Sequence, residues 1–406
     1  MNKVNTICLS MIVKDESHII MECLESVAPH IDYWCICDTG STDGTQEIIK
    51  KFFEEKGIPG ELHETEWKNF GHNRTEALDL CKDKSEYIFM IDADDHLVGD
   101  FKWPKEMTLD GYEIHLQRGG LEWWRIQCFL NNGTWMYDGV LHEYPRLKEN
   151  KPPQIQKIFG DYYIEARTLG ARNQNQTPIE KYTKDAIMLE EALKEEPNNV
   201  RHQFYLAQSY FDSKQWEKAI ASYIKRAQMG GWEEEVYFSL YRIGICKVMQ
   251  EKPMEEVSMA FLQSWQYRPI RAEPLHELAR YLRIKEQPRL GYLYAKMALD
   301  IKYPEWDILF VNKEVYEYNI LDEIAATAFY VHEFDEGLRA CRKLLSMNLP
   351  DEYKNRIRSN MAQYEPAAKS HKERLDAMKQ KRNLEKQNSK SATKPKTYKK
   401  KKKVKR

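Results

Sequence analysis

The first ninety residues alternate between short apolar runs and segments in which apolar residues recur every three or four positions. Apolar runs occur at 6–13, 33–37 and 87–91, and residues 61–67 offer a further candidate strand. Such runs predict strands that are buried on both faces. The helical spacing between them, as over 70–81, predicts helices that cover the sheet. This order predicts an α/β, Rossmann-like domain with a mostly parallel sheet.

A different pattern follows residue 95, where apolar and polar positions alternate in the manner of half-buried strands. Turn-forming residues such as Gly119-Gly120 separate these segments. The candidate strands lie at 111–118, 121–130, 136–144 and 163–167. A polar connection at 169–175 follows the last of them, so we place the end of the α/β domain at residue 175.

From Thr177 onward the chain is predominantly helical. Thr177-Pro178-Ile179-Glu180 has the sequence of a capping box with proline at the first helical position. Further along, small and apolar residues recur at fixed offsets in three segments, which begin at Ala207, Ala279 and Ala325. These offsets match tetratricopeptide-type helix pairs. We therefore predict an all-α, tetratricopeptide-like region over 176–365, which either supports the α/β domain or binds an acceptor or partner protein.

Charge is unevenly divided along the 406 residues, although the formal net charge is only −1. From Lys369 onward there are 17 basic and 3 acidic residues, which leaves 45 basic and 60 acidic residues before it. Residues 366–406 contain too few apolar residues to form a core, so we predict disorder there after an initial helical segment. A solvated tail, a nuclear address and a contact with a polyanion such as nucleic acid all fit this composition.

The eight cysteines are scattered and mostly lie within apolar runs, which favours reduced, buried thiols. The apolar run 7–13 leads directly into Lys14-Asp15-Glu16, which is not the pattern of a secretory signal. No run approaches the roughly 18 apolar residues of a membrane span. We therefore expect a cytoplasmic protein without a membrane-spanning segment.

Acidic residues follow three of the predicted strands. Asp92 and Asp94 stand one residue apart after the run 87–91, Asp15 follows the first strand, and Asp38 ends the second. The carboxyl ends of parallel strands meet at one edge of a sheet, where ligands bind. Grouped carboxylates repel one another unless a cation lies between them, and Mg²⁺ and Mn²⁺ prefer carboxylate and phosphate oxygens. The pattern predicts a metal and nucleotide-diphosphate site.

Four motifs in this region resemble those of glycosyltransferase family 2. They are Ile12-Val13-Lys14-Asp15-Glu16, Asp38-Thr39-Gly40-Ser41-Thr42-Asp43-Gly44-Thr45, Gly71-His72-Asn73-Arg74 and Asp92-Ala93-Asp94. The resemblance covers about the first 170 residues and implies the GT-A fold. It also implies an inverting, metal-dependent transfer from a nucleotide-diphosphate sugar, with a UDP-sugar as the expected donor and Mn²⁺ or Mg²⁺ as the cofactor.

By this resemblance, Asp38 would contact the base or ribose of the nucleotide, and Asp15 would lie near the ribose. Arg74 would lie near the base or phosphates. Asp92 would hold the ribose and the metal, and Asp94 the metal. Chemistry agrees, because an aspartate can accept from a uracil N–H or a ribose hydroxyl and an arginine can bind phosphate through two hydrogen bonds. Arg74 could instead pair with its neighbours on a helix surface.

Transfer to an acceptor hydroxyl also needs a general base. The family's usual Glu-Asp and Gln-x-x-Arg-Trp signatures are not present in this chain, and we take Glu143 as the first candidate and Asp138 as the second. His142 offers a further metal ligand or, alternatively, a histidine hydrogen-bonded within a sheet. Arg172, in the polar connection, could close over a diphosphate or lie on the surface.

Two other functions fit parts of the pattern. A sugar-phosphate nucleotidyltransferase can share a related sheet, but Lys14-Asp15-Glu16 stands where its glycine-rich loop is expected. A repeat scaffold with an inactive transferase domain is the non-enzymatic alternative, and the intact Asp38, Asp92 and Asp94 argue against it. We therefore predict a glycosyltransferase that takes a nucleotide-sugar donor and a glycan or protein acceptor. The sequence does not identify the sugar, the nucleotide base or the acceptor.

Overall fold

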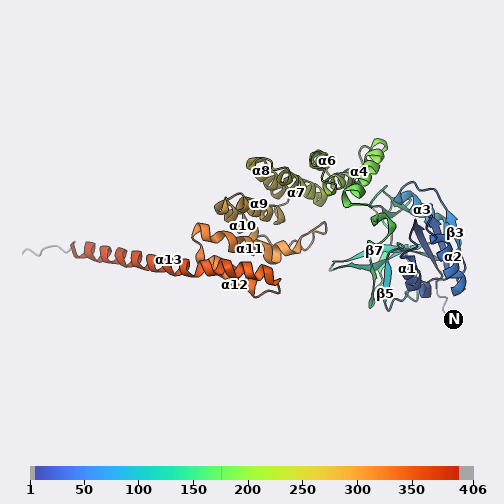
Figure 1. Cartoon of the computed structure of the whole chain (residues 1–406), viewed down its shortest axis with the longest axis horizontal. Helices are drawn as coiled ribbons and strands as arrows, with labels where there is room; N and C mark the ends of the chain where they lie inside the picture. Colours follow the sequence, from blue (N-terminus) through green and yellow to red (C-terminus); the bar gives the residue numbers. More distant parts are fainter. Residues whose placement is uncertain (1–4, 120, 175, 393–406) are drawn as a thin grey trace, which may run out of the picture. The chain divides into compact units, whose positions relative to one another are not determined.

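The computed structural model describes residues 5–119, 121–174 and 176–392. They fall into two compact units that divide between Gly231 and Trp232. The first unit contains an α/β sheet followed by three helices, and the second is entirely helical (Figure 1). This succession confirms the predicted fold class, an α/β domain followed by an all-α region.

A mixed, mostly parallel sheet of nine strands is the centre of the first unit in the part of the chain described. Its parallel half runs in the order β3-β2-β1-β4. β7 pairs with β4 in the antiparallel sense, and β6, β11 and β5 follow it, while β10 pairs with β6. The strands are β1 (Ile7–Val13), β2 (Tyr33–Asp38), β3 (Gly60–Glu64), β4 (Tyr87–Met90), β5 (His96–Gly99), β6 (Gly111–Arg118), β7 (Leu121–Leu130), β10 (Ile155–Lys157) and β11 (Tyr162–Glu165).

Helices cover both faces of this sheet, as the alternating pattern predicted. Leu9 and Met11 of β1 belong to one apolar core with residues of α1 and α2, whereas Cys8 belongs to a second core with residues of α3. The period of two along β1 therefore sends successive side chains into different layers. The helices are α1 (Ile20–Val27), α2 (Thr45–Lys56) and α3 (Phe70–Leu80), and the short helices η1 (Ala28–His30) and η2 (Ala171–Asn173) join other elements.

The predicted strand over 136–144 is interrupted in the structure. It forms β8 (Trp135–Asp138) and β9 (Tyr144–Leu147), which pair with each other in a separate two-stranded sheet. Gly139 and His142 between them have φ values of 102° and 54°, so the chain turns where the sequence pattern continues to alternate. The turn brings the segment around Gly139 against the beginning of α3.

Three helices complete the first unit. They are α4 (Pro178–Glu195), α5 (Val200–Asp212) and α6 (Trp216–Gln228). The predicted capping box is present: Thr177 Oγ1 accepts from the Glu180 backbone N–H at 3.3 Å, and the Thr177 N–H donates to Glu180 Oε2 at 2.7 Å. The change from strands to helices thus falls near residue 175, while the compact unit continues to Gly231.

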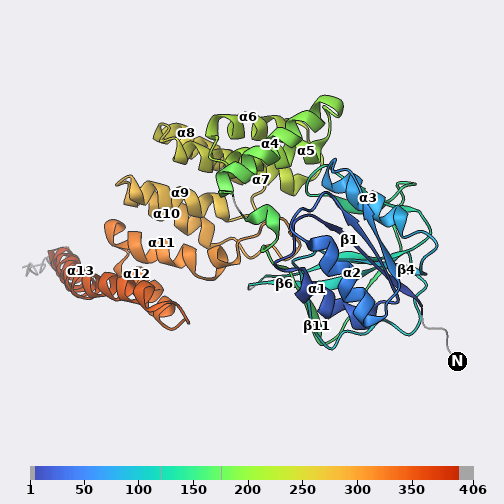
Figure 2. The same cartoon turned by 45° about the vertical axis from the view of Figure 1, so that its right-hand side comes forward.

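The second unit consists of helices that pack in succession. Consecutive helices contact each other, and Figure 2 shows α9 and α10 side by side. Small residues allow these contacts, since a methyl group on Gly244 would lie 2.7 Å from the Phe261 ring and one on Gly291 3.0 Å from the carbonyl oxygen of Ala279. The helices are α7 (Glu233–Met249), α8 (Met254–Tyr267), α9 (Glu273–Ile284), α10 (Pro288–Leu299), α11 (Ile320–Thr327), α12 (Phe334–Leu345) and α13 (Asp351–Ala392), with η3 (Val315–Asn319) and η4 (Ala328–Val331) beside α11.

The structure differs from the predicted tail over 366–392. These residues continue α13, which passes through Pro366 and ends at Ala392 (Figure 1). Lysine, glutamate, glutamine and arginine are good helix formers, so a charged segment can be helical without contributing to a core. The rest of the predicted tail, 393–406, lies outside the described residues.

All eight cysteines are buried free thiols, as their positions in apolar runs indicated. Among the described residues, no helix combines the length and the apolar character that crossing a bilayer requires.

Candidate functional site

The acidic motifs meet at one edge of the sheet, where β1, β2 and β4 end. β1 lies between the other two strands and is parallel to both, with Val13 opposite Asp38 and Ser10 opposite Met90. The segments that follow these strands therefore leave the sheet on the same side. This places residues 14–16, the end of β2 and the segment 91–95 around one region.

Asp38 is fully buried at the end of β2. Its Oδ1 accepts hydrogen bonds from the backbone N–H groups of Gly40 at 2.9 Å and Ser41 at 2.8 Å. Its Oδ2 is also buried and has no hydrogen-bond partner among the residues that the structure describes. An unpartnered buried acceptor is costly. Oδ2 is therefore suited to accept an N–H or O–H from a ligand.

The loop after β2 is joined to the loop after β1. Asp15, with φ at 55°, donates its backbone N–H to Ser41 Oγ at 2.9 Å and accepts from the Thr42 N–H at 2.7 Å. The Glu16 N–H donates to Thr45 Oγ1 at 2.8 Å. These reciprocal bonds hold the two glycosyltransferase-like motifs in one fixed arrangement.

Arg74 is buried at the centre of a charged cluster. Its Nη2 donates to Asp92 Oδ1, and its Nε donates to Glu143 Oε1 at 2.7 Å. Arg125 of β7 lies 3.5 Å from the second oxygen of Asp92. Burial favours the neutral carboxyl, but the charges of Arg74 and Arg125 outweigh it and hold the pKa of Asp92 below its usual range. Arg74 is thus an interior residue of this region and not a partner on a helix surface.

Asp95 lies in the same surroundings as Asp92, but its pKa shifts in the opposite direction. It is almost fully buried, and its Oδ1 accepts from the Arg167 N–H at 3.1 Å. Burial and then the negative charge of Asp92 raise the pKa of Asp95. The pKa values of Asp92 and Asp95 are therefore shifted in opposite directions.

Residues 167–174, which we call the strap, connect the last strand to α4 and bind two carboxylates. The backbone N–H groups of Leu169 and Gly170 donate to Asp94 Oδ2 at 3.0 and 2.9 Å. The Ala171 N–H lies 3.2 Å from each oxygen of Glu16. Asp94 and Glu16 therefore approach the same short piece of backbone from the ends of two strands.

Asp94 and Glu16 provide oxygen donors of the kind that Mg²⁺ and Mn²⁺ prefer. Burial, together with the nearby charge of Asp94, raises the pKa of Glu16 to about 7, against the opposing effects of the Ala171 hydrogen bond and of His18. A methyl group on Gly170 would lie 3.0 Å from Glu16 Oε1 and 3.3 Å from Asp94 Oδ2. Two carboxylates held this way fit a divalent cation, because positive charge would relieve their repulsion.

The other predicted metal ligands have different surroundings. Both oxygens of Asp92 face arginines. The ring of His142 stacks on Tyr205 of α5 with centroids 3.9 Å apart. Loss of solvation, and then the positive charges of Arg201, Arg172 and Lys181, lower the pKa of His142 to about 4. The metal role of His142 stays a prediction.

Elsewhere in the described chain, Cys35, Glu61 and His63 have ligand atoms within 4.8 Å of one another on β2 and β3. Lys84 Nζ bonds Glu61 Oε1 at 2.6 Å, so a protein cation already balances the carboxylate of this group.

The two candidate bases, Glu143 and Asp138, contact different residues. Glu143 joins the Arg74 cluster through its Oε1. Asp138 faces away from that cluster toward Arg146, whose Nε donates to Asp138 Oδ2 at 2.7 Å, and the Tyr144 hydroxyl lies 3.4 Å from the same oxygen. The geometry thus brings Glu143, and not Asp138, into contact with the residues of the predicted nucleotide site.

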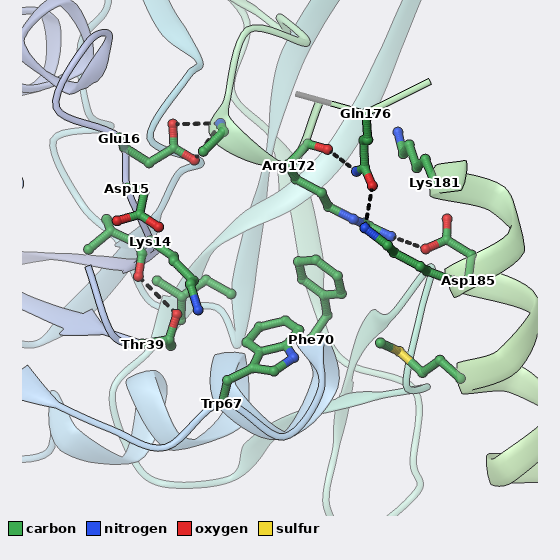
Figure 3. A pocket seen from close by; sticks show the side chains of 15 residues that line it. Lys14, Asp15, Glu16, Thr39, Trp67, Phe70, Arg172, Gln176, Lys181 and Asp185 are labelled. Carbon is green, nitrogen blue, oxygen red and sulfur yellow. Dashed lines mark hydrogen bonds and ion pairs between the residues drawn. The ribbon is translucent and has the colours of Figure 1, made fainter. Parts of the chain in front are cut away.

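A pocket of about 530 Å³ lies beside this edge of the sheet (Figure 3). Lys14, Asp15 and Glu16 line one side, and Trp67 and Phe70, with ring centroids 4.8 Å apart, line its floor in that view. The strap and the first turns of α4 line the remaining side. The space is large enough for a small ligand with charged and aromatic parts.

Arg172 lies in the wall of this pocket. Its guanidinium pairs with Asp185 of α4 and stands 4.6 Å from the centre of the Phe70 ring. Arg172 is both a lining residue of the pocket and exposed to solvent, so its closure over a diphosphate stays a prediction.

Sequence reasoning did not assign roles to Glu16, Arg125 or the pocket-lining residues of α4. Glu16 stands within a motif already noted at the end of the first strand, so a signal for it was present. Arg125 lies in the middle of a strand. It contacts Asp92, which is 33 positions earlier in the chain, and no local sequence pattern predicts such a contact.

Part of the chain is similar to known glycosyltransferases. Residues 8–105 match the model of glycosyl transferase family 2. The chain is 27% identical over 244 residues to the SPbeta prophage-derived glycosyltransferase SunS of Bacillus subtilis (strain 168), covering 55% of this chain and 53% of SunS. This chain thus spans about half the length of that relative.

Two further similarities are to a repeat-containing protein and to one solved structure. A TPR repeat-containing protein of Synechococcus elongatus, Synpcc7942_0270, is 33% identical over 93 residues, covering 23% of this chain and 21% of that protein. The crystal structure of MamA is similar with a TM-score of 0.33 and 16% identity, covering 44% of this chain and 95% of MamA.

The match over 8–105 includes β1, β2 and β4 together with Asp15, Asp38, Arg74, Asp92 and Asp94, so the residues that converge at the sheet edge are those of the matched segment. Residues 8–105 of this chain are thus similar to glycosyl transferase family 2 domains.

Proposed function

We propose that this protein transfers a sugar, with inversion, from a nucleoside-diphosphate sugar to a hydroxyl group of a glycan or protein acceptor. One observation carries the proposal. Asp38, the Arg74–Asp92 pair and Asp94 converge at one sheet edge beside a pocket of about 530 Å³. A nucleotide sugar presents N–H and O–H donors, a diphosphate and a leaving sugar, and this set of side chains has a partner for each.

The nucleoside part of the donor would be recognised by carboxylates. The free Oδ2 of Asp38 accepts a hydrogen bond from a base N–H or a ribose hydroxyl. Asp15, fixed by Ser41 and Thr42, lies next to it and is assigned to the ribose. Arg74 and Arg125 keep Asp92 ionised, so that it too accepts from a hydroxyl group.

Asp94, with Glu16 as the second carboxylate, would hold Mg²⁺ or Mn²⁺, and the bound ion would neutralise charge on the departing diphosphate. Leu169 and Gly170 fix one oxygen of Asp94 and set the direction of the carboxylate. A donor with a UDP moiety is our first choice, on the family resemblance.

Glu143 is the proposed base for the acceptor. Its Oε1 is held by Arg74, and the carboxylate can receive the acceptor hydroxyl proton on Oε2 as the oxygen forms its bond to the sugar carbon. Asp138 is the alternative, but its partner Arg146 directs it away from the Arg74 cluster.

Binding and turnover with defined donors test this function. Nucleotide sugars carrying UDP, GDP and other bases are mixed with the full chain and Mn²⁺, and release of the nucleoside diphosphate and thermal stability are measured. We expect one nucleotide class to stabilise the protein only when the ion is present, because diphosphate and carboxylates repel each other without it. Asp94→Asn should remove the dependence on the ion.

The proposal would be excluded if no nucleotide sugar stabilised the protein and none released its nucleoside diphosphate. Equal stabilisation by a nucleoside diphosphate with and without chelator would exclude the metal site alone.

A further inference from the structure

The first helix of the helical region, α4, forms a wall of the pocket. Lys181, Lys184, Asp185 and Met188 line it and recur at spacings of three and four residues, which places them on one face of the helix. Figure 3 shows Lys181 and Asp185 on the side of the pocket opposite Asp15 and Glu16. A family 2 pocket is thus bounded here by an element outside the matched segment 8–105.

The two lysines have neutral hydrogen-bond partners. Lys181 Nζ donates to Asn173 Oδ1 at 2.7 Å, and Lys184 Nζ donates to Gln176 Oε1 at 3.0 Å. Neither lysine has a carboxylate within ion-pair distance in the part of the chain that the structure describes. Asp185, the carboxylate on the same face, is engaged by Arg172. The wall therefore has an excess of positive charge.

The surroundings of Lys181 show that this charge is not freely solvated. Burial, and then the charge of Arg172, lower the pKa of Lys181. An ammonium group in such a place gains more from an anion than from an amide oxygen, because a hydrogen bond between charged groups is about twice as strong as a neutral one. The amide oxygens of Asn173 and Gln176 hold the lysines in position without neutralising them.

The opposite side of the pocket has the reverse charge. Asp15 and Glu16 stand there, and Trp67 and Phe70 offer aromatic surface between the two sides. Such a pocket suits a ligand with an anionic end and a planar or hydroxylated end. A nucleoside diphosphate has both.

We propose that Lys181 and Lys184 of α4 bind the diphosphate of the donor, so that the helical region completes the nucleotide pocket. This inference rests on the proposed function and specifies which residues outside the family 2 segment the donor requires. Phosphate oxygens replace the amide oxygens of Asn173 and Gln176 as acceptors, and no covalent step is involved.

The test compares ligands that differ in phosphate content. Dissociation constants for uridine, UMP, UDP and inorganic pyrophosphate are measured by calorimetry with Mn²⁺ on the full chain and on the Lys181→Gln/Lys184→Gln variant. Lys194→Gln is the matched control, because Lys194 is exposed on the same helix and pairs with Glu191 at 2.5 Å. Each lost charged hydrogen bond weakens UDP binding by about tenfold.

We expect the double variant to bind UDP and pyrophosphate at least tenfold more weakly while uridine stays within about twofold, so that the preference for UDP over uridine falls. The Lys194→Gln variant should keep the wild-type values. Equal UDP affinity in the double variant and the wild type would overturn the inference and leave the proposed function intact. Equal loss of uridine and UDP would also overturn it, since the effect of the lysines would then not depend on the phosphates.

The two proposals fail in different ways. If the wild type binds pyrophosphate through the lysines but binds no nucleotide, the anion site stands and the nucleotide-sugar function falls. If the wild type binds neither pyrophosphate nor any nucleoside diphosphate, both proposals are excluded.

Discussion

Single residues in the segment 92–95 show how neighbouring carboxylates acquire different properties. Asp92 faces two arginines, Asp94 accepts backbone N–H groups, and Asp95 is buried beside Asp92. The pKa of Asp92 is lowered and that of Asp95 is raised. Arginine charge, backbone donors and burial are separate physical effects, and each carboxylate experiences a different balance of them.

Glu143, the proposed base, is the first residue whose role can be tested. Glu143→Gln keeps the shape of the side chain and its contact with Arg74 but removes proton acceptance. We expect donor affinity to stay within about twofold and kcat to fall by about 10²–10⁴, the usual contribution of a positioned base. Asp138→Asn, which loses part of its bond to Arg146, should change kcat little. The readout is single-turnover kinetics with donor binding measured in parallel.

A large fall of kcat in Asp138→Asn, together with a near-normal kcat in Glu143→Gln, would assign the role of base to Asp138. Loss of donor binding in both would place the segment 138–143 in the nucleotide site and the base elsewhere.

A second prediction at this scale concerns pH. His202 of α5 is buried, and loss of solvation lowers its pKa, against weaker opposing effects from Glu196 and Asp138. The unfolded chain therefore binds the proton more readily than the folded one. Stability from this residue is present above the unfolded pKa of about 6.5 and is lost as the pH falls below it.

Urea unfolding at pH 7 and pH 5 measures the effect. In the wild type, the unfolding free energy should fall between pH 7 and pH 5. In His202→Asn this fall should be smaller by up to about 2 kcal/mol. His72→Asn, which changes an exposed histidine on α3, should leave the loss unchanged. An unaltered pH dependence in the His202 variant would contradict the assignment.

At the scale of helices and strands, a close backbone contact positions α3 at the site. The beginning of α3 packs on the turn between β8 and β9, where a methyl group on Gly71 would lie 2.3 Å from the carbonyl oxygen of Gly139. This contact sets the distance between Arg74, one turn further along α3, and Glu143, which follows the same turn. The glycine in the Gly71-His72-Asn73-Arg74 motif thus has a packing reason.

Gly71→Ala should therefore disturb both stability and the site. We expect a loss of about 1–3 kcal/mol in unfolding free energy, since the opposing group is backbone and cannot rotate away. Donor affinity should fall with it. Gly57→Ala is the comparison: its methyl group would meet no atom within 4 Å, and its φ of 65° predicts only the smaller cost of a left-handed backbone. Equal effects of the two variants would contradict the close-packing explanation.

The boundary between the two compact units does not coincide with the change from strands to helices. Strands give way to helices near residue 175, but α4, α5 and α6 belong to the compact unit that contains the sheet. The strap binds Asp94 and Glu16 at one end and pairs Arg172 with α4 at the other. The sheet and the first helices therefore form one structural unit around the pocket.

Fragments of the chain test this division. A fragment ending at Gly231 should fold and keep UDP affinity within about twofold, because it retains the contacts of its own unit. A fragment ending at residue 175 lacks Lys181, Lys184 and the partner of Arg172, and should lose at least about tenfold in affinity or fail to fold. Circular dichroism and calorimetry on both fragments provide the readout. Full affinity in the shorter fragment would contradict the division.

The sequence by itself determined most of the elements and the edge of the sheet where the site forms. Periods of two and about four residues fix which segments are strands and helices, and the order of strands and helices predicts a mostly parallel sheet. Asp15, Asp38, Asp92 and Asp94 stand at the ends of strands or a few residues beyond them, so parallel pairing brings them to one edge. The capping box at Thr177 is equally local and was predictable for that reason.

Only the tertiary structure decided which of these residues contact one another. Glu143 reaches Arg74 from 69 positions away, the strap reaches Glu16 from 155 positions away, and one face of α4 closes the pocket. Local periodicity carries no information about these pairings, because they depend on how loops and helices pack above the sheet edge. The break between β8 and β9 has the same cause, since close packing against α3 turns a chain whose pattern continues to alternate.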